Sequence, residues 1–195
     1  MVAECLLAHV ARHVRLDPAE QVLLTDALLA RSVRRGETVL NQGETCSKFF
    51  FVESGSFRAF HLNPEGKDAT VMFALADWWI TDMDAFAHQV PSSLTIAALE
   101  ESAVWALDFG RMQSLLEAVP KLERYFRILY QHAYIREQRR ALLNLSQSTA
   151  RRYESFLRQF PQISRKVTQK QIASYLGVTP EFLSAVKKKP GLKKS

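Results

Sequence analysis

The sequence QKQIASYLGVTPEFLSAVKKK, residues 169–189, contains two short amphipathic segments separated by a glycine. Thr168 precedes the first segment and Gln171 follows three positions later, which is the pattern of a capping box at a helix start. The second segment begins in the same way, with Thr179 as the cap and Pro180 at the first helical position. The stretch therefore predicts a helix-turn-helix whose second helix exposes its N-terminal face, the arrangement that enters a DNA major groove.

The charge is unevenly distributed along the chain. Residues 1–110 carry 8 Lys and Arg against 15 Asp and Glu, a net charge of −7, whereas residues 111–195 carry 18 against 5, a net charge of +13. Because each neutralised phosphate releases condensed counterions, this basic excess indicates a polyanionic partner, double-stranded DNA. The alternatives are a solvated basic face and a helix on a membrane surface. Charges interrupt every apolar run before the roughly 20 residues of a membrane helix, so we expect a cytoplasmic protein without membrane association.

Short apolar or alternating segments separated by turn signals occupy residues 31–108. KFFFVE, FRAFHL, ATVMFAL, LTIAALE and AVWALD are typical of strands, and NPEG at residues 63–66 is typical of a tight turn. A helix is expected before them over residues 16–29, with Asp17 as its N-cap. The number of strands predicts a small closed or double-sheet β domain, which we interpret as a double-sheet β-roll, or jelly roll, at the core of a domain spanning residues 1–110.

A long helical segment is predicted to begin at Arg111. Its apolar residues recur in alternating steps of four and three, the spacing of a two-stranded coiled-coil seam. These residues are Leu115, Val119, Leu122, Phe126, Leu129 and Ala133. We interpret residues 111–145 as a dimerisation helix of a symmetric homodimer, the alternative being a helix packed on its own β domain. A further amphipathic helix over residues 148–160 opens the predicted DNA-binding domain, residues 146–195.

Two motifs carry a resemblance to a known family: FFFVESGSFRAF at residues 49–60 and QKQIASYLGVTPEFLS at residues 169–184. Together with the order of the predicted domains, they make nearly the whole chain resemble the Crp/Fnr family of bacterial transcription regulators. The resemblance implies an α+β protein with a cyclic-nucleotide-binding-like β-roll, a dimerisation helix and a C-terminal helix-turn-helix. It also implies a homodimer that binds a palindromic DNA site, contacts RNA polymerase and responds to a small-molecule or redox signal in the roll.

The predicted roll departs from the pattern of family members that bind cyclic AMP. Those members hold the ribose with the glutamate of a Gly-Glu-Leu turn and the phosphate with an Arg-Ser pair. Here Trp78 and Trp79 stand near the glutamate position, residues 91–93 (PSS) replace the pair, and the helix segment that offers hydroxyls to the base contains Arg136. Because no arginine can pair with a cyclic phosphate, we expect that cyclic AMP does not bind in the usual way.

The interior of the roll therefore either holds a different, more apolar ligand or is filled by the tryptophans. The candidate pocket residues are Phe73, Trp78, Trp79, Ser92, Ser93 and Arg136. We predict no cofactor, and the identity of a small-molecule effector is left open.

The predicted recognition helix also departs from the family pattern. The resemblance implies an arginine four positions after a glutamate, where it reads guanine, but Glu181 is followed by Ala185. Loss of a bidentate base contact removes roughly 1–3 kcal/mol of discrimination, so either Lys187 or Lys188 substitutes or the protein reads a different site. The predicted DNA-binding residues are Gln169, Lys170, Thr179, Pro180, Glu181, Ser184, Lys187 and Lys188. The sequence ends at KKKPGLKKS without the wing of longer relatives, and this tail either follows the DNA backbone or stays disordered.

No residue pattern indicates a metal site or an enzyme. His9 and His13 are one helical turn apart, but no third ligand is visible, and Cys5 and Cys46 provide neither a disulfide framework nor the four thiolates of an iron–sulfur cluster. A cupin enzyme would need clustered His and carboxylate ligands, which the sequence lacks. The rival to a DNA-binding regulator is therefore a DNA-silent sensor or interaction protein that keeps the family fold.

Overall fold

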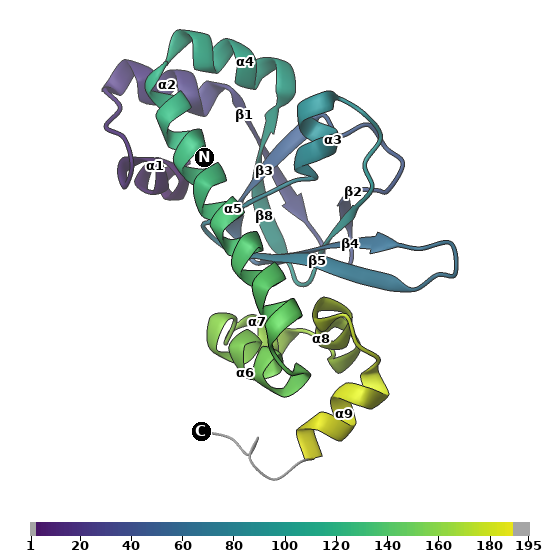
Figure 1. Ribbon diagram of the computed structural model, residues 1–195. Helices are drawn as coiled ribbons and strands as arrows, with labels where there is room; N and C mark the ends of the chain where they lie inside the picture. The colour runs from purple at the N-terminus through teal and green to yellow at the C-terminus, as the bar shows by residue number, and fades with distance from the viewer. Residues whose placement is uncertain (1–2, 189–195) are drawn as a thin grey trace.

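The computed structural model describes residues 3–188, which form an N-terminal β-roll, one long helix and a group of C-terminal helices (Figure 1). The strands are β1 (Leu28–Val33), β2 (Thr38–Leu40), β3 (Lys48–Ser54), β4 (Ser56–Leu62), β5 (Asp68–Leu75), β6 (Trp79–Ile80), β7 (Thr95–Ala98) and β8 (Ser102–Asp108). The helices are α1 (Glu4–Ala11), α2 (Pro18–Asp26), α3 (Met83–His88), α4 (Phe109–Ala118), α5 (Lys121–Ser146), α6 (Thr149–Gln159), α7 (Ile163–Lys166), α8 (Gln169–Leu176) and α9 (Pro180–Lys188). The predictions for the tail at residues 189–195 and for the missing wing fall outside the described residues.

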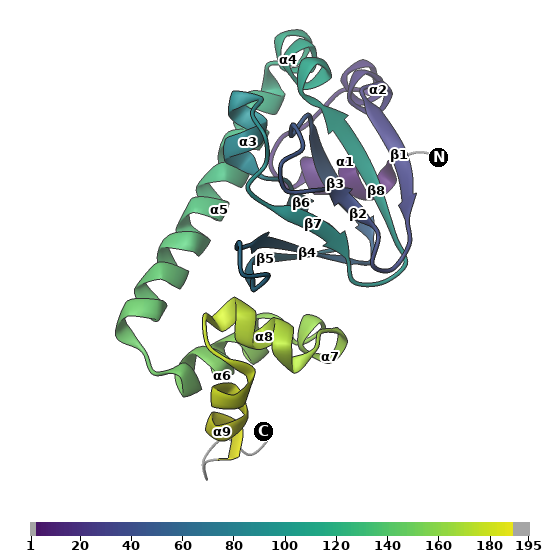
Figure 2. The ribbon, with the colours of Figure 1, turned by 90° about the vertical axis from the view of Figure 1, so that its right-hand side faces the viewer.

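The described strands of the roll form two four-stranded antiparallel sheets, which confirms the predicted double-sheet fold (Figure 2). Their strand orders are β1-β8-β3-β6 and β2-β7-β4-β5. The predicted turn at residues 63–66 joins β4 to β5, and the Gly66 N–H donates to the Asn63 carbonyl at 2.9 Å. The predicted helix before the strands is shorter than expected, but Asp17 and Glu20 form a complete capping box at the start of α2.

Gly55 is the single residue between β3 and β4, and its backbone adopts φ +88°. A Cβ at this position would lie 2.1 Å from the Ser102 hydroxyl oxygen and 2.9 Å from the Glu101 carbonyl oxygen. Both the left-handed conformation and the space around it therefore require glycine.

The helical segment predicted from Arg111 is two helices, α4 and α5, separated at Val119 and Pro120. Val119 has φ −130° and ψ 75°, outside the helical region. Proline lacks a backbone N–H and disfavours the helical conformation of the residue before it, so the chain bends here. The prediction of one continuous helix is therefore wrong at this point.

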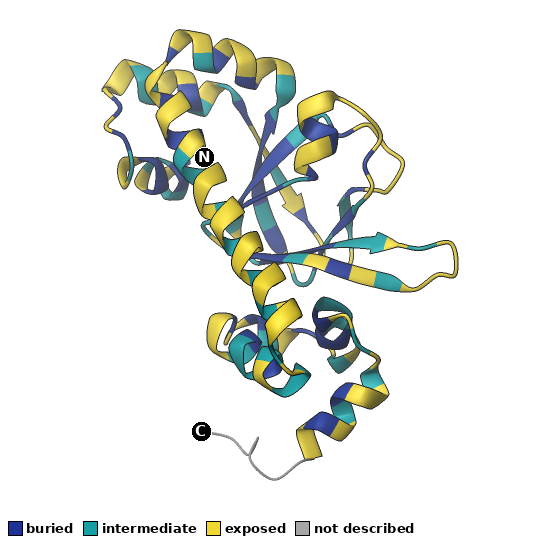
Figure 3. Ribbon diagram, in the orientation of Figure 1, coloured by how far each residue is buried: buried dark blue, intermediate teal, exposed yellow. Residues whose placement is uncertain are grey.

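Most of the predicted coiled-coil seam lies in the core of its own chain. Leu115, Val119, Leu122 and Phe126 are at most 4% exposed and belong to the hydrophobic core of the roll. Leu129 packs partly buried against the same core, and Ala133 is half-buried. The four buried side chains cannot contact a partner helix, which corrects this part of the predicted dimer interface; the apolar spacing instead marks the face that covers the roll (Figure 3).

A buried polar chain fixes how α5 is rotated on the roll. The indole N–H of Trp79 donates to the Tyr125 hydroxyl at 2.7 Å, and that hydroxyl lies 2.8 Å from Nδ1 of His9 in α1. Burial lowers the pKa of His9, so the neutral imidazole is favoured. Its Nδ1 can then accept a hydrogen bond from the Tyr125 hydroxyl. Three segments that are far apart in sequence are thus joined at one hydroxyl.

We expect Gly55→Ala to lower the free energy of unfolding by at least ~2 kcal/mol, because it adds a clash to the cost of a left-handed alanine. Gly66→Ala is the matched control: it has φ +73° but open space around the added Cβ, and should cost about 1 kcal/mol. Urea denaturation of both variants measures the difference. Equal losses would show that the contact with Ser102 does not constrain the turn.

Candidate nucleic-acid interface

The helix pair α8–α9 has the local structure that its sequence predicts. Thr168 and Gln171 form the capping box of α8, with the Gln171 N–H donating to Thr168 Oγ1 at 3.2 Å and the Thr168 N–H donating to Gln171 Oε1 at 2.8 Å. Gly177 ends α8 with φ +67°, and Thr179 Oγ1 accepts from the Phe182 N–H at 3.2 Å at the start of α9. The two helices are thus joined by a short turn with a cap on each side of it.

The side chains of α9 divide into a buried face and an outer face. Leu183 and Val186 are buried against the other C-terminal helices. Glu181, Ser184 and Lys188 recur in steps of three and four on the opposite side, where Glu181 and Lys188 are exposed and Ser184 is half-buried. Figures 1 and 2 show that α9 projects from the end of the molecule furthest from the roll, so this outer face is accessible.

Two other predicted DNA-binding residues, Gln169 and Lys187, make contacts within the C-terminal helices. Lys187 Nζ lies 3.4 Å from Gln169 Oε1 and 5.8 Å from the centre of the Tyr153 ring. The Gln169 amide nitrogen in turn lies 3.4 Å from the Pro180 carbonyl oxygen. Lys170 is exposed at the start of α8. The structure therefore brings these residues to one end of the molecule but turns Lys187 away from the outer face of α9.

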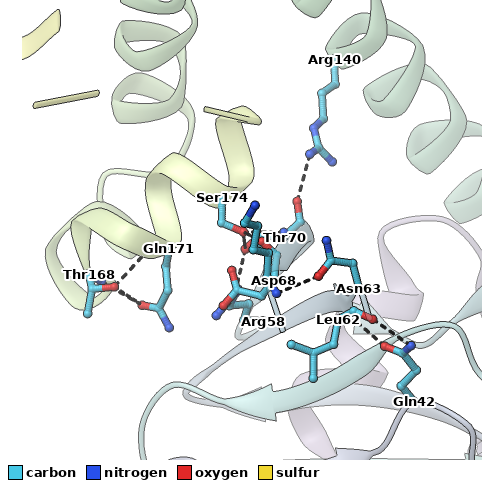
Figure 4. Close-up of polar contacts among 11 residues, drawn as sticks. Gln42, Arg58, Leu62, Asn63, Asp68, Thr70, Arg140, Thr168, Gln171 and Ser174 are labelled. Atoms are coloured by element: carbon cyan, nitrogen blue, oxygen red, sulfur yellow. Dashed lines mark hydrogen bonds and ion pairs between the residues drawn. The ribbon is translucent and has the colours of Figure 1, made fainter. Parts of the chain in front are cut away.

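α8 rests on the hairpin formed by β4 and β5, through a polar cluster that sequence reasoning missed (Figure 4). The Ser174 hydroxyl donates to the Asp68 carbonyl at 2.9 Å and accepts from the Thr70 N–H at 2.8 Å. Beneath this contact the guanidinium of Arg58 lies 2.7 Å from the Asp68 carboxylate. No sequence pattern links Ser174 to a strand about a hundred positions earlier, so only the fold could show this contact.

Arg140 of α5 ties the same two parts together from the side. Its guanidinium donates to the carbonyl oxygens of Thr70 at 3.1 Å, Tyr175 at 3.2 Å and Val71. Its charged end also lies 4.3 Å from the centre of the Tyr175 ring, within the range of a cation–π contact. Arg140 therefore connects the long helix, the hairpin and α8.

The serines predicted to face a ligand in the roll are bound to a carboxylate of the same chain. Asp82 Oδ2 accepts from the Ser92 hydroxyl at 2.9 Å, the Ser93 N–H at 2.9 Å and the Ser93 hydroxyl at 3.0 Å. Burial alone would raise the pKa of Asp82, but hydrogen bonds from Ala85, Ser92 and Ser93 outweigh burial and hold this pKa below its ordinary value. An anionic ligand at these serines would face a fixed negative charge.

The candidate pocket residues do not form one site. Trp79 is 9% exposed and packs in the roll, with its ring centre 4.6 Å from that of Phe49, so this tryptophan fills the interior. Phe73 is buried against Phe156 of α6, outside the roll. Of the predicted set, Trp78 and Arg136 lie side by side, with the guanidinium 5.0 Å from the Trp78 ring centre.

Among residues 3–188, no three His, Cys, Asp or Glu side chains form a group that could hold a metal ion. Cys46 is buried, and its sulfur lies 3.1 Å from the Thr81 hydroxyl oxygen, so its side chain packs in the interior of the protein. No helix of the described residues combines the length and the apolar composition needed to cross a membrane.

Comparisons with known proteins agree with this architecture. Residues 30–119 match the model of the cyclic nucleotide-binding domain. The transcriptional activator protein FnrA of Stutzerimonas stutzeri is 29% identical over 199 residues, covering 94% of this chain and 79% of that protein. The domain match and this relative together support the resemblance of the chain to the Crp/Fnr family. The transcriptional activator protein Anr of Pseudomonas protegens is 27% identical to this chain, over the same shares of the two chains.

Two solved structures have a fold similar to that of this chain. A candidate Crp/Fnr regulator from Eubacterium rectale superposes with a TM-score of 0.71 at 20% identity, covering 88% of this chain and 82% of that one. The c-di-GMP responsive regulator CLP of Xanthomonas campestris superposes with a TM-score of 0.70 at 14% identity, covering 88% and 90%. At these identities the likeness establishes the arrangement of roll, long helix and C-terminal helices.

We expect Asp82→Ala to lower the free energy of unfolding by about 2–3 kcal/mol at neutral pH, because it leaves the donors of Ser92 and Ser93 without their acceptor. Asp84→Ala, two positions away on the exposed surface, is the control and should change stability by no more than ~0.5 kcal/mol.

Because the pKa of Asp82 is lowered in the folded state, its stabilisation is complete above the ordinary carboxyl pKa. The difference from the parent should therefore shrink as pH falls through the lowered pKa. Denaturant titrations at several pH values measure this, and a pH-independent difference would contradict the assignment.

Proposed function

We propose that this protein is a transcription regulator that binds double-stranded DNA through α9. The observation that carries the proposal is the outer face of this helix, where Glu181, Ser184 and Lys188 are presented by a capped, buried scaffold away from the roll. The half of the chain that contains α9 carries a net charge of +13, which supports a polyanionic partner. Related proteins named as transcriptional activators further support the proposal.

The residues on and near α9 have different roles in this proposal. Glu181 can accept a hydrogen bond from a cytosine amino group, and Ala185 offers at most contact with a thymine methyl. Lys188 is exposed and suits a phosphate, as does Lys170 at the N-terminus of α8. Lys187 is held near Gln169, so Lys188 rather than Lys187 is positioned for this phosphate contact.

We further propose that two chains pair along the outer face of α5. Exposed apolar side chains follow the helix beyond the roll: Tyr130, Tyr134, Leu142 and Leu145. Tyr134 and Leu145 are eleven positions apart, about three helical turns, so they lie on one line, and they are 68% and 89% exposed. A groove of about 400 Å³ lined by Met112, Leu116 and Tyr130 continues this face. A two-fold pair would present two copies of α9 to a palindromic site.

The proposal divides the chain into sensing by residues 1–110, pairing by residues 111–145 and DNA binding by residues 146–195. Contact with RNA polymerase and action in the cytoplasm belong to the same proposal, because the family implies both. The second candidate, a DNA-silent sensor, is favoured by one observation: Ala185 stands where the family pattern places a base-reading arginine.

Fluorescence anisotropy with a selected palindrome and a scrambled duplex, over a range of salt concentrations, tests DNA binding. Lys188→Ala should weaken binding to both duplexes and reduce the salt slope by about one, whereas Glu181→Ala should relax base preference. Lys121→Ala is the control, because Lys121 pairs with Glu20 at the opposite end of the molecule. If both α9 variants behave like the parent, the groove assignment is wrong, and weak unselective binding by the parent supports the DNA-silent candidate.

Sedimentation equilibrium tests the pairing face. The double variant with Tyr134→Glu and Leu145→Glu should raise the dissociation constant of the dimer at least tenfold. The reason is that pairing would desolvate two carboxylates per chain. Val22→Glu, at an apolar residue of α2 that is 56% exposed, should leave the dimer unchanged. A monomeric parent, or a double variant that still pairs, would overturn this interface.

A further inference from the structure

A cavity of about 600 Å³ lies between α5, α6 and α8, beside Trp78 of the roll. Its volume falls in the range of small-molecule sites. Four arginines line it, from two different helices: Arg136, Arg139 and Arg140 from α5, and Arg152 from α6. The cavity lies outside the roll, away from the serines that hold Asp82.

The charge of these arginines is largely uncompensated. Glu137 is the one carboxylate within ion-pair distance of them in residues 3–188, at 3.4 Å from Arg136 and 3.5 Å from Arg140. Over the same residues, Arg139 and Arg152 contact no carboxylate. Four guanidinium groups against one carboxylate give the cavity an excess of about three positive charges, which favours an anionic occupant.

Arg152 is positioned as a preorganised donor. Its terminal nitrogens donate to Asn144 Oδ1 at 3.0 Å, the Leu176 carbonyl at 2.8 Å and Thr149 Oγ1 at 3.2 Å. These contacts lock the side chain, while its Nε is buried without a hydrogen-bond partner. A buried N–H without an acceptor is costly, and residues 3–188 supply none, so an acceptor oxygen within reach of this nitrogen would be stabilising.

Aromatic rings form the other walls of the cavity. The guanidinium carbon of Arg136 lies 5.0 Å from the centre of the Trp78 ring. That of Arg140 lies 4.3 Å from the centre of the Tyr175 ring. Phe156 of α6 also lines the space. Flat rings beside planar guanidinium groups suit a planar ring in the ligand, which can stack on either surface.

The cavity stays accessible when two chains pair as proposed. With roughly 100° between successive helical residues, Arg136 and Arg139 lie about 160° and 140° around α5 from Tyr134. The cavity and the proposed pairing face are therefore on nearly opposite sides of the helix. A partner chain on that face would not fill the space.

We propose that this cavity binds a small phosphorylated molecule that carries a planar ring. Its phosphates pair with Arg139 and Arg152, and its ring lies between the aromatic walls. The occupant contacts α5, α6 and α8 together, so its binding site exists only while these three helices keep this arrangement.

Isothermal titration calorimetry on the full chain tests the proposal with ATP, AMP and adenosine, which share one ring and differ in phosphate charge. We expect one site per chain and an affinity that rises from adenosine to AMP to ATP. Arg139→Gln and Arg152→Gln should each weaken ATP binding about tenfold, the effect of losing one charge-assisted pair. Arg151→Gln is the matched control, because Arg151 is the exposed neighbour on α6 outside the cavity.

Arg139 is exposed, and its side chain makes no hydrogen bond or ion pair within residues 3–188, so its substitution should not disturb folding. Lys188→Ala should retain ATP binding, which separates the cavity from the proposed DNA surface. The proposal is overturned if none of the three compounds binds, or if both cavity variants bind ATP like the parent. These titrations contain no DNA, so their outcome does not depend on the proposed function.

Discussion

The first turns of α5 are anchored in the roll by Leu122 and Phe126, and by the Tyr125 hydroxyl that joins Trp79 to His9. This packing leaves the helix no freedom to rotate without breaking a buried polar chain. The rotation of its first turns then determines where every later side chain of the same helix points. One side carries exposed apolar residues, and the other carries the arginines of the cavity and faces the C-terminal helices.

Features that depend on neighbouring residues could be predicted from the sequence. The capping boxes, the turn at residues 63–66 and the left-handed Gly177 follow from hydrogen bonds and backbone sterics within a few positions. The apolar spacing after Arg111 correctly marked a buried face, but periodicity does not say what covers that face. Pro120 was a visible local signal for the break before α5, and the regular apolar steps on both sides of it concealed the break.

The geometry of the candidate DNA surface was predictable because α8 and α9 are short, capped and adjacent in sequence. The occupation of Ser92 by a carboxylate of the same chain was not predictable from the sequence. It depends on a fold that brings Asp82 to a serine ten positions away. The cavity was also beyond sequence reasoning. The basic excess was evident, yet only the packing of α6 against α5 shows that Arg139 and Arg152 line the same cavity.

Phe73 belongs to β5 of the roll, but its side chain is 1% exposed and lies in the hydrophobic cluster of the C-terminal helices, against Phe156 and Tyr175. One aromatic ring of the C-terminal core is therefore contributed by a strand of the N-terminal roll. Separating the two parts would leave a void in one and an uncovered ring on the other. Denaturation should accordingly proceed as one cooperative transition, and an isolated C-terminal fragment would lack part of its own interior.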